Sequence, residues 1–540
     1  MKTYLALFFI FFLASCGRYE ALTGGEKDTI PPKMIASNPT SDSTRIGDLN
    51  SFTFRFSERI DRASFESRFY MIPFLKYPVT FDWNGWSEVT ANIKDTLRED
   101  VTYVIKLGKG IKDLHDGVSD KEYQFAITKA EKLDSISFAG TLKTRKQHTQ
   151  LKVALYKDLD FSTYPNYIAD VGKNGRFHIK YVRPDTYVGI VYNDSKNNHK
   201  IEIDQDLIGF FTDSIRLAES TEGRYHLTLF KEDTMYSIID KVDSVGYLTS
   251  TLTFTKAIDT LRSSFFFEDT NKVRYPFKRM FLEDKKLTVI HDSLPPEINV
   301  RYSKLTTLRG ISIDSMTYDA EYIQRLRPDT GIFKITSLSF SDSAVSKKVK
   351  PKFKFEFSHP FIWNEQEYIG LFLDGNHVAT EIKQTSPKSI VLEPKKELLL
   401  SKEYRIKARF KRLKNLWGNT VQDSLINCRI YSPDKKDFGW LTFQTKSKRD
   451  SLNIILYSTS NPNKPYKTTR IKANTMHEVT HMKGGNYILH FFHDQDGNGT
   501  LSSGQLKPLT FSEPFYMYPD TIHIRSRWEQ EIKQPIDVGF

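Results

Sequence analysis

Cysteine is nearly absent from this sequence, since Cys16 and Cys428 are the only two among 540 residues. A disulfide framework is therefore excluded. The apolar run from Tyr4 to Leu13 is too short to span a bilayer. Few segments carry the i, i+3, i+4 spacing of an amphipathic helix. A Gly-rich phosphate loop and a G-x-S-x-G motif are also missing, so the common signatures of nucleotide-binding enzymes and α/β-hydrolases do not occur.

Aromatic residues are abundant instead. They make up 13% of the chain, with 39 Phe and 27 Tyr, and they alternate with polar residues at a period of two, as in Lys352-Phe353-Lys354-Phe355. This pattern predicts an all-β fold of tandem β-sandwiches. The formal net charge of +12 is dispersed over strand-like segments, as on the solvated faces of antiparallel sheets. It also favours attraction to an anionic membrane surface or a phosphorylated glycan.

Four segments recur with a lag of about 300 residues. Tyr187 and Asp194 match Tyr487 and Asp494. The other matched segments are FAGTLKT (138–144) with FGWLTFQ (438–444), LKVALYKD (151–158) with LNIILYST (452–459), and FTFRFSERI (52–60) with FKFEFSHPF (353–361). A constant lag predicts a duplicated two-part unit.

A chain of this length is too long for a single core, so we expect several domains. The predicted boundaries are 28–130, 131–215, 216–331, 332–434 and 435–540, after a leader at 1–15 and a tether at 16–27. The segment 216–331 has strand-like runs but no signature that we can assign, and we expect it to be a third kind of β-domain. Cys428 lies in the strand-like run LINCRIY, where we expect a small buried apolar residue.

The N-terminus combines Lys2, an apolar run and small residues before Cys16, which is typical of an export signal. The segment LASC-G resembles the lipobox of bacterial lipoproteins. The resemblance implies that residues 1–15 are removed and that acyl chains, palmitate among them, are attached to Cys16. The alternative is an ordinary secretory signal that ends beside a cysteine.

A lipid on Cys16 would attach the chain to the outer membrane, on its periplasmic face or at the cell surface. The residues after it, Gly17 to Glu20, lack the acidic cluster that resembles a surface-export signal, which favours the periplasmic face. Because the chain would lie outside the cytoplasm, nucleic acid is excluded as a partner. An envelope protein or a glycan is the expected partner.

Residues 28–128 carry an extended Ile30-Pro31-Pro32 entry, alternating Phe52, Phe54 and Phe56, and the strand-like run Tyr103 to Leu107. This segment resembles bacterial Ig-like domains of the S-layer type. A second copy spans about 333–432 and lacks the Pro-Pro entry.

Residues 135–211 contain the strand-like runs ISFAG and VALY, an Asn174-Gly175 hairpin signal and a strand that begins at Tyr187. This segment resembles the transthyretin-like, carboxypeptidase-regulatory type of β-sandwich. The resemblance implies a non-catalytic spacer or docking module. A second copy runs from Phe438 to the C-terminus and lacks the Asn-Gly pair.

The run His477-Glu478-Val479-Thr480-His481 has the HExxH spacing of zinc peptidases. Two histidines at this spacing share a metal only on a helix, and in a strand they are ~13 Å apart. Val479 and Thr480 are β-branched, and the repeat aligns the run with a predicted strand at 177–181. We therefore predict a strand. A zinc peptidase, with His490 or His493 as third ligand, is the alternative.

The loop Asp494-x-Asp496-x-Asn498-Gly499-Thr500 matches the first seven positions of a calcium loop, but position twelve is Gln505 instead of a bidentate Glu. Asp494, Asp496, Asn498 and Thr500 are the candidate ligands for a structural calcium ion. The alternative is an Asp/Asn/Gly turn that bonds its own backbone. In the first copy, at 194–198, Lys196 stands where a ligand would be.

Together these patterns predict a non-catalytic, lipid-anchored envelope protein that spaces and presents β-sandwich modules to a partner protein or glycan. A carbohydrate-binding protein is a second hypothesis, and it requires an exposed aromatic platform. The candidates are Trp83, Trp86, Trp363, Trp417, Trp440 and Trp528. A glycosidase pair of carboxylates, which need not be close in sequence, is a further alternative.

Overall fold

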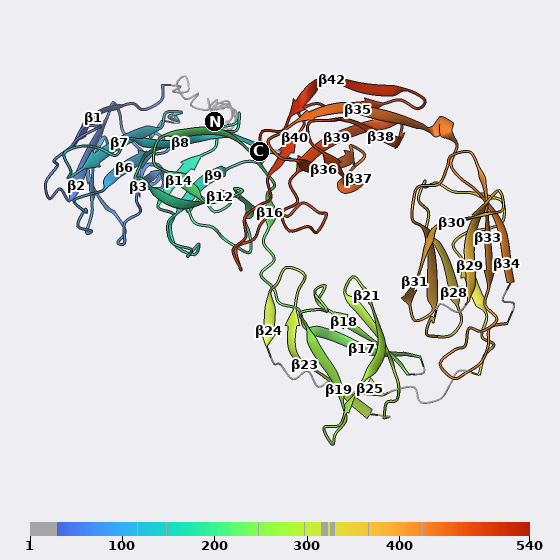
Figure 1. Cartoon of the computed structure of the whole chain (residues 1–540). Coiled ribbons are helices and arrows are strands. Elements are labelled where there is room, and N and C mark those ends of the chain that lie inside the picture. The colour runs from blue at the N-terminus through green and yellow to red at the C-terminus, as the bar shows by residue number, and fades with distance from the viewer. Residues whose placement is uncertain are drawn as a thin grey trace, which may run out of the picture. The chain divides into compact units, whose positions relative to one another are not determined.

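The computed structural model describes residues 30–540 apart from 116, 147, 247, 296, 315–321, 324–329, 365–366 and 423–424. The predicted leader, Cys16 and the tether therefore lie outside the described residues. Within them the regular structure is almost entirely β-strand (Figure 1), which confirms the all-β prediction. The helices described are the short α2 (Arg62–Glu66) and the 3-10 turn η1 (Lys435–Asp437). None of the helices described has the length and apolarity of a membrane span.

The chain divides into two compact units. Unit 1 comprises the described residues up to Leu142 together with His148–Glu202 and Ser214–Tyr225, and unit 2 comprises Lys143–Gln147, Ile203–Asp213 and His226–Phe540.

The first sandwich of unit 1 consists of the sheets β1-β2-β5-β4 and β3-β6-β7. Its strands are β1 (Met34–Asn38), β2 (Ser51–Phe56), β3 (Phe69–Ile72), β4 (Thr80–Asn84), β5 (Glu88–Asn92), β6 (Thr102–Leu107) and β7 (Tyr123–Thr128). Phe52, Phe54 and Phe56 of β2 are buried between the sheets while Arg55 is exposed. The alternation in the sequence thus gives the inward face of the strand.

The second sandwich of unit 1 contains the sheet β11-β8-β15 and the neighbours β10-β9-β12, with β14 beside β12. Its strands are β8 (Ile136–Thr144), β9 (Leu151–Tyr156), β10 (Tyr167–Asp170), β11 (Arg176–Val182), β12 (Asp185–Asn193), β14 (Ile215–Leu217) and β15 (Thr221–Leu227). The prediction of a hairpin at Asn174-Gly175 is wrong. The turn is present, with Gly175 at φ 79°, but it joins β10 to β11, which belong to different sheets.

In unit 2, strands between residues 239 and 323 form the sheets β17-β18-β22-β21 and β20-β19-β23-β24, with β25 beside β23. Their strands are β17 (Ile239–Gly246), β18 (Thr249–Phe254), β19 (Ser264–Glu268), β20 (Arg274–Tyr275), β21 (Phe277–Glu283), β22 (Lys286–His291), β23 (Glu297–Thr306), β24 (Ser312–Asp314) and β25 (Tyr322–Ile323). Also in unit 2, β13 (Leu207–Phe210) pairs with β16 (Phe230–Lys231). The strands 239–305 enclose their own apolar core, centred on Leu252, Phe267 and Val300.

The last two sandwiches repeat the strand orders of the first two. The sheets β26-β28-β32-β31 and β27-β34-β33-β29-β30 are followed by β38-β35-β42 and β37-β36-β39-β40, with β41 beside β39. Their strands are β26 (Ile335–Leu338), β27 (Ala344–Val345), β28 (Phe353–Phe357), β29 (Tyr368–Leu373), β30 (Asn376–Val378), β31 (Thr380–Ser386), β32 (Ser389–Pro394), β33 (Glu403–Arg409), β34 (Leu425–Tyr431), β35 (Phe438–Lys446), β36 (Ser451–Ser458), β37 (Asn461–Lys472), β38 (Met476–Lys483), β39 (Gly485–Phe492), β40 (Phe515–Met517), β41 (Ile522–Ile524) and β42 (Glu529–Asp537).

The duplication extends to single hydrogen bonds. The Tyr187 hydroxyl donates to the Arg183 carbonyl at 3.0 Å, and the Tyr487 hydroxyl donates to the Lys483 carbonyl at 2.8 Å. Both tyrosines are buried at the start of their strands. The predicted lag of about 300 residues is therefore a repeated three-dimensional unit.

One predicted alignment within the repeat is wrong. The match of FAGTLKT with FGWLTFQ makes Phe138 equivalent to Phe438. In the structure, however, Phe138 pairs with Ile179 of β11, and the equivalent of Ile179, Val479 of β38, pairs with Leu441. The correct equivalent of Phe138 is therefore Leu441, three residues further along. The loop that follows β35 is two residues shorter than the loop that follows β8, so it absorbs two of these three residues.

Cys428 lies in β34 and is half-buried, packed against the core of its sandwich. It is thus less enclosed than predicted. Burial raises the pKa of its thiol, and so does the charge of Asp342, which keeps the thiol protonated and unreactive at neutral pH.

Candidate functional site

The HExxH run lies in β38, as predicted. Val479 is buried against the core, and the two histidines have different partners. His477 Nε2 lies 3.1 Å from Thr475 Oγ1, whereas His481 Nδ1 lies 2.6 Å from Glu397 Oε2 in the preceding sandwich. The helical geometry in which these histidines would share a zinc ion is therefore not formed.

The calcium-loop candidate follows β39 and brings three carboxylates together. Oxygens of Asp494, Asp496 and Glu513 all lie within 4.8 Å of one another. Asn498 and Thr500, the other predicted ligands, are engaged locally. Asn498 Oδ1 accepts hydrogen bonds from the Thr500 amide at 2.6 Å and from its hydroxyl at 2.5 Å. Of the four predicted ligands, the fold thus places Asp494 and Asp496 in a carboxylate cluster.

Glu513 is the member that sequence reasoning missed. It is 3% exposed, and its carboxylate accepts the amides of Gln495 at 2.6 Å and Ser502 at 2.9 Å. Burial raises the pKa of Glu513, and so does the charge of Asp496. The twelve-residue spacing points to Gln505 instead, whose side chain donates to the Arg309 carbonyl at 3.0 Å. No spacing rule leads to Glu513, because it joins the loop from the segment before β40.

In the equivalent loop of unit 1, a lysine of the same sandwich lies near the aspartate carboxylate. Asp194 is 1% exposed and accepts the amides of Asn198 and His199. The Lys152 ammonium lies 3.8 Å from its carboxylate. By strand register, Lys152 opposite Tyr192 corresponds to Asn453 opposite Phe492.

In the second copy Asn453 therefore takes the place of the lysine. Its amide donates to Asp494 Oδ2 at 3.2 Å, while Asp494 Oδ1 is buried with no hydrogen-bond partner. The first copy thus places the Lys152 ammonium near the Asp194 carboxylate. The second copy places the neutral amide of Asn453 there and leaves one oxygen of Asp494 without a hydrogen-bond partner.

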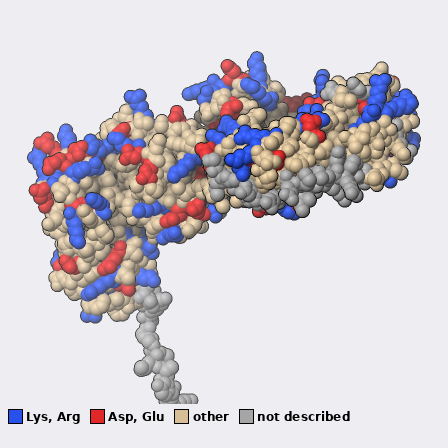
Figure 2. Space-filling view, turned by 90° about the horizontal axis from the view of Figure 1, so that it is seen from below, with Lys and Arg blue, Asp and Glu red and all other residues tan. Residues whose placement is uncertain are grey.

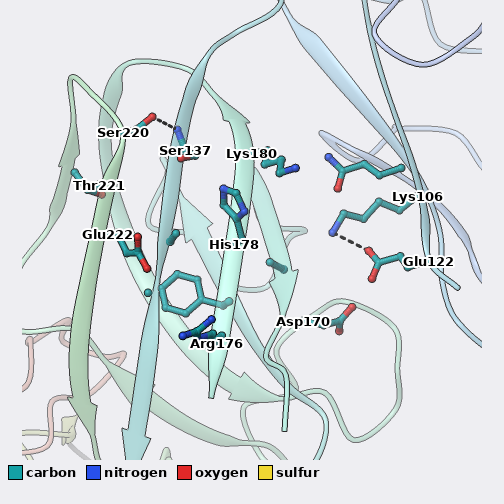
Figure 3. A pocket seen from close by; sticks show the side chains of 15 residues that line it. Lys106, Glu122, Ser137, Asp170, Arg176, His178, Lys180, Ser220, Thr221 and Glu222 are labelled. Atoms are coloured by element: carbon teal, nitrogen blue, oxygen red, sulfur yellow. Dashed lines mark hydrogen bonds and ion pairs between the residues drawn. The ribbon is translucent and has the colours of Figure 1, made fainter. Parts of the chain in front are cut away.

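A groove of about 860 Å³ lies on the outer face of the sheet β11-β8-β15 in unit 1 (Figure 3). Arg176, His178 and Lys180 of β11 follow one another along it, as Figure 3 shows. The wall from the first sandwich holds Lys106, whose ammonium lies 3.4 Å from Glu122 Oε1. The lining includes side chains of both charges as well as apolar residues.

The six tryptophans do not form one shared platform. Trp363 is 5% exposed, whereas Trp86 and Trp528 are 46% and 70% exposed. The Arg62 guanidinium covers the Trp86 ring at 4.5 Å. Trp440, partly exposed, lines a second groove of about 710 Å³ in unit 2 with Arg527. Trp83, Trp86 and Trp417 lie outside the grooves described here, and Trp83 donates to Glu66 at 3.0 Å.

Charged residues of both signs lie on the face that Figure 2 displays. Figure 2 shows Lys and Arg interspersed with Asp and Glu on the face it displays. Local arrangement, and not the formal net charge of +12, therefore decides where an anion is attracted.

Comparisons with known proteins give a family for part of the chain. Residues 28–128 match the family model described as a bacterial Ig-like domain. A comparison with curated proteins found no match. Solved structures that align with the chain include the S-layer protein rSbsC (11% identity, 89% of this chain, 68% of that chain, TM-score 0.14).

A tandem repeat from the extending region of a large adhesion protein also aligns (10% identity, 66% of this chain, 95% of that chain, TM-score 0.16). So does the Bacillus anthracis TIE protein (8% identity, 95% of this chain, 76% of that chain, TM-score 0.12). Scores this low carry no argument, and the fold rests on the sheets described above. The resemblance of residues 28–128 to bacterial Ig-like domains, predicted from Phe52, Phe54 and Phe56, is confirmed by the family match.

Proposed function

We propose that this chain is a non-catalytic, lipid-anchored protein of the cell envelope that spaces β-sandwich modules and presents them to a partner protein or glycan. The observation that carries the proposal is the repeated joint between each Ig-like sandwich and the sandwich that follows it.

At both joints, the side chain at the same position of the repeat contacts a carboxylate of the preceding sandwich. Tyr181 and His481 interrupt β11 and β38 at bulges, each with φ 59°. The Tyr181 hydroxyl donates to Asp42 at 2.8 Å, and His481 bonds Glu397 at 2.6 Å. A left-handed backbone conformation is uncommon for residues other than glycine. Because both copies combine this conformation with a hydrogen bond to the preceding sandwich, we infer that the duplication preserved the joint. Fixed joints suit a spacer.

Each joint has a second charged contact. In unit 1 the Arg183 guanidinium lies 2.7 Å from Asp100. In unit 2 the Lys467 ammonium lies 3.3 Å from Glu397. Isolated exposed pairs contribute only ~0–1 kcal/mol, so these contacts favour a defined geometry more than a tight association.

The anchor belongs to the proposal. Acyl chains on Cys16 would bury CH₂ groups in the membrane at about 0.8 kcal/mol each, and two or more chains would give stable attachment. We propose the outer membrane as the location, with the periplasmic face favoured over the cell surface. Carbohydrate binding is the second candidate function, and the groove along β11, with its exposed charged side chains, supports it. The zinc-peptidase alternative loses support because the HExxH run lies in a strand.

We also propose a structural calcium ion at the loop of Asp494, Asp496 and Glu513. Calcium prefers carboxylate oxygens, and three converge here. The first copy neutralises its equivalent carboxylate with Lys152, whereas the second has Asn453. The ion would stiffen the loop and take no part in chemistry.

The docking function is tested by crosslinking in intact cells, followed by pull-down of the wild type and of Cys16→Ser. One specific envelope protein recovered with the wild type and lost with the variant would support docking. Glycan recovered without protein would favour the carbohydrate-binding function. Recovery of the same cytoplasmic proteins with both forms would refute the envelope function.

A further inference from the structure

We propose that the groove along β11 binds an anionic carbohydrate chain, whose carboxylate or phosphate groups are held by Arg176 and Lys180. The inference rests on the proposed docking function, because it names the class of glycan and the surface that binds it.

The cationic stripe follows from strand geometry. Successive side chains of a β-strand point to opposite faces. Phe177 and Ile179 are buried in the core, so Arg176, His178 and Lys180 point outward and are exposed. Residues four apart in a strand are separated by ~13 Å. This spacing fits a ligand with repeated charges better than a single small anion.

The two cations lack acidic partners of their own. Among the described residues, no carboxylate lies within ion-pair distance of Arg176 or Lys180, whereas Asp170 of the same groove already has Lys152 at 2.7 Å. Glu222, also in the lining, lies on β15, which β8 separates from β11, and its charge acts on His178. Guanidinium and ammonium groups left free in a concave surface attract carboxylates and phosphates.

His178 lies between Arg176 and Lys180 on the strand, and nearby charges shift its pKa. Burial lowers the pKa of His178, and the charges of Lys180 and Lys106 lower it further, against an opposing effect of Glu222. Of the charges that act on His178, those of Lys180 and Lys106 are positive and that of Glu222 is negative.

The remaining lining favours a sugar over a peptide. Ser137 and Gln124 supply a hydroxyl and an amide group, which can pair with sugar hydroxyls. The apolar members are small or, like Phe177, buried. They provide no pocket for an apolar peptide side chain, which is what peptide grooves use for specificity.

The duplication supplies an internal comparison. In β38 the positions equivalent to the stripe are Met476, Glu478 and Thr480. The second copy has thus no cation at these positions. The scaffold does not need a cationic stripe to fold, and its presence in the first copy reflects a function specific to that copy.

The test measures binding to the purified whole chain by isothermal titration calorimetry at physiological salt. The probes are oligogalacturonate, phosphorylated dextran, neutral dextran and poly-glutamate. Oligogalacturonate or phosphorylated dextran should bind, and which of them does distinguishes carboxylate from phosphate recognition. Neutral dextran and poly-glutamate should bind at least tenfold more weakly.

The variant Arg176→Met with Lys180→Thr gives β11 the residues of the second copy and should weaken binding at least tenfold. The matched control is Lys407→Thr with Arg409→Met, which removes the same charge from exposed positions of β33 and should change affinity less than twofold. Ala139→Glu, which places a carboxylate in the groove, should also abolish binding. Thermal melts should be unchanged, because the replaced side chains are at least partly exposed.

Equal losses in the stripe and control variants would overturn the site, because they indicate diffuse attraction. Binding of poly-glutamate as tight as that of the anionic sugars would overturn the carbohydrate assignment. If no anionic sugar binds while crosslinking recovers an envelope protein, this inference fails and the docking function stands. If the sugar binds but the cells show no anchor-dependent partner, the envelope function fails instead.

Discussion

Replacing Tyr487 by Phe removes one hydroxyl from a network that is repeated 300 residues earlier. That hydroxyl donates to the Lys483 carbonyl at 2.8 Å. In turn, the Lys483 amide donates to the Tyr466 hydroxyl at 3.0 Å, and the two tyrosine rings are 4.9 Å apart. Burial raises the pKa of Tyr487, helped by Tyr466, so the phenol stays protonated and able to donate.

The first copy contains the same network. The Tyr187 hydroxyl donates to the Arg183 carbonyl at 3.0 Å, and the Arg183 amide donates to the Tyr167 hydroxyl at 3.3 Å. Its rings are 5.7 Å apart. Because the networks match, the hydroxyls should contribute equally to stability.

A buried hydrogen bond contributes about 0.5–1.5 kcal/mol net. We therefore expect Tyr187→Phe and Tyr487→Phe each to cost about 1 kcal/mol, which lowers the melting temperature of a 60–100-residue domain by about 4–8 °C. Hydrogen exchange followed by mass spectrometry assigns the loss to one sandwich. Exchange in the strands of the altered copy should be about fivefold faster, since 1.4 kcal/mol corresponds to tenfold.

Tyr368→Phe is the control, because that side chain is 54% exposed, and such a change should stay within about 0.5 kcal/mol. A loss in one copy only, or faster exchange spread over both copies, would refute the equivalence of the two networks.

Three further predictions follow from the same structure. Phe355→Ala removes a fully buried ring and should cost about 3–5 kcal/mol by urea unfolding of the second Ig-like sandwich; a loss under 1 kcal/mol would contradict its core position. Calcium should raise the melting temperature of the wild type and of Asp194→Asn but not of Asp494→Asn; an equal shift in all three would exclude the loop. Burial alone would raise the pKa of Glu397, but His481 and Lys467 lower it overall. The contribution of Glu397 to stability is therefore present above pH ~4.3 and is lost as the pH falls through the pKa of the folded state. Glu397→Gln should therefore flatten the stability of the joint between pH 5 and 3, and an unchanged slope in pH-dependent unfolding would contradict the pairing.

Local sequence pattern predicted the strands because burial in a sandwich alternates along each strand. Phe353, Phe355 and Phe357 illustrate this, and all three are buried. The HExxH run was predicted to be a strand from the β-branched Val479 and Thr480 and from its alignment with 177–181. Such patterns report the face of a residue and not its partner across the sheet.

The features that the sequence did not reveal depend on pairing between distant strands. The three-residue shift of Phe138 against its repeat is set by the register of β8 with β11. Glu513 reaches the calcium-loop candidate because β40 pairs with β39. The exchange of Lys152 for Asn453 becomes visible once both loops are aligned by strand register. In the sequence, the stripe on β11 appears only as polar residues that alternate with apolar ones. The groove forms because residues of the first sandwich pack beside this strand.

The anchor is the claim on which the envelope function depends most directly. Metabolic labelling with radioactive palmitate, followed by fractionation of cells that express the wild type or Cys16→Ser, measures it in one experiment. We predict a labelled wild-type chain in the outer-membrane fraction and an unlabelled variant released from it. An unlabelled wild-type chain in the soluble fraction would contradict the account.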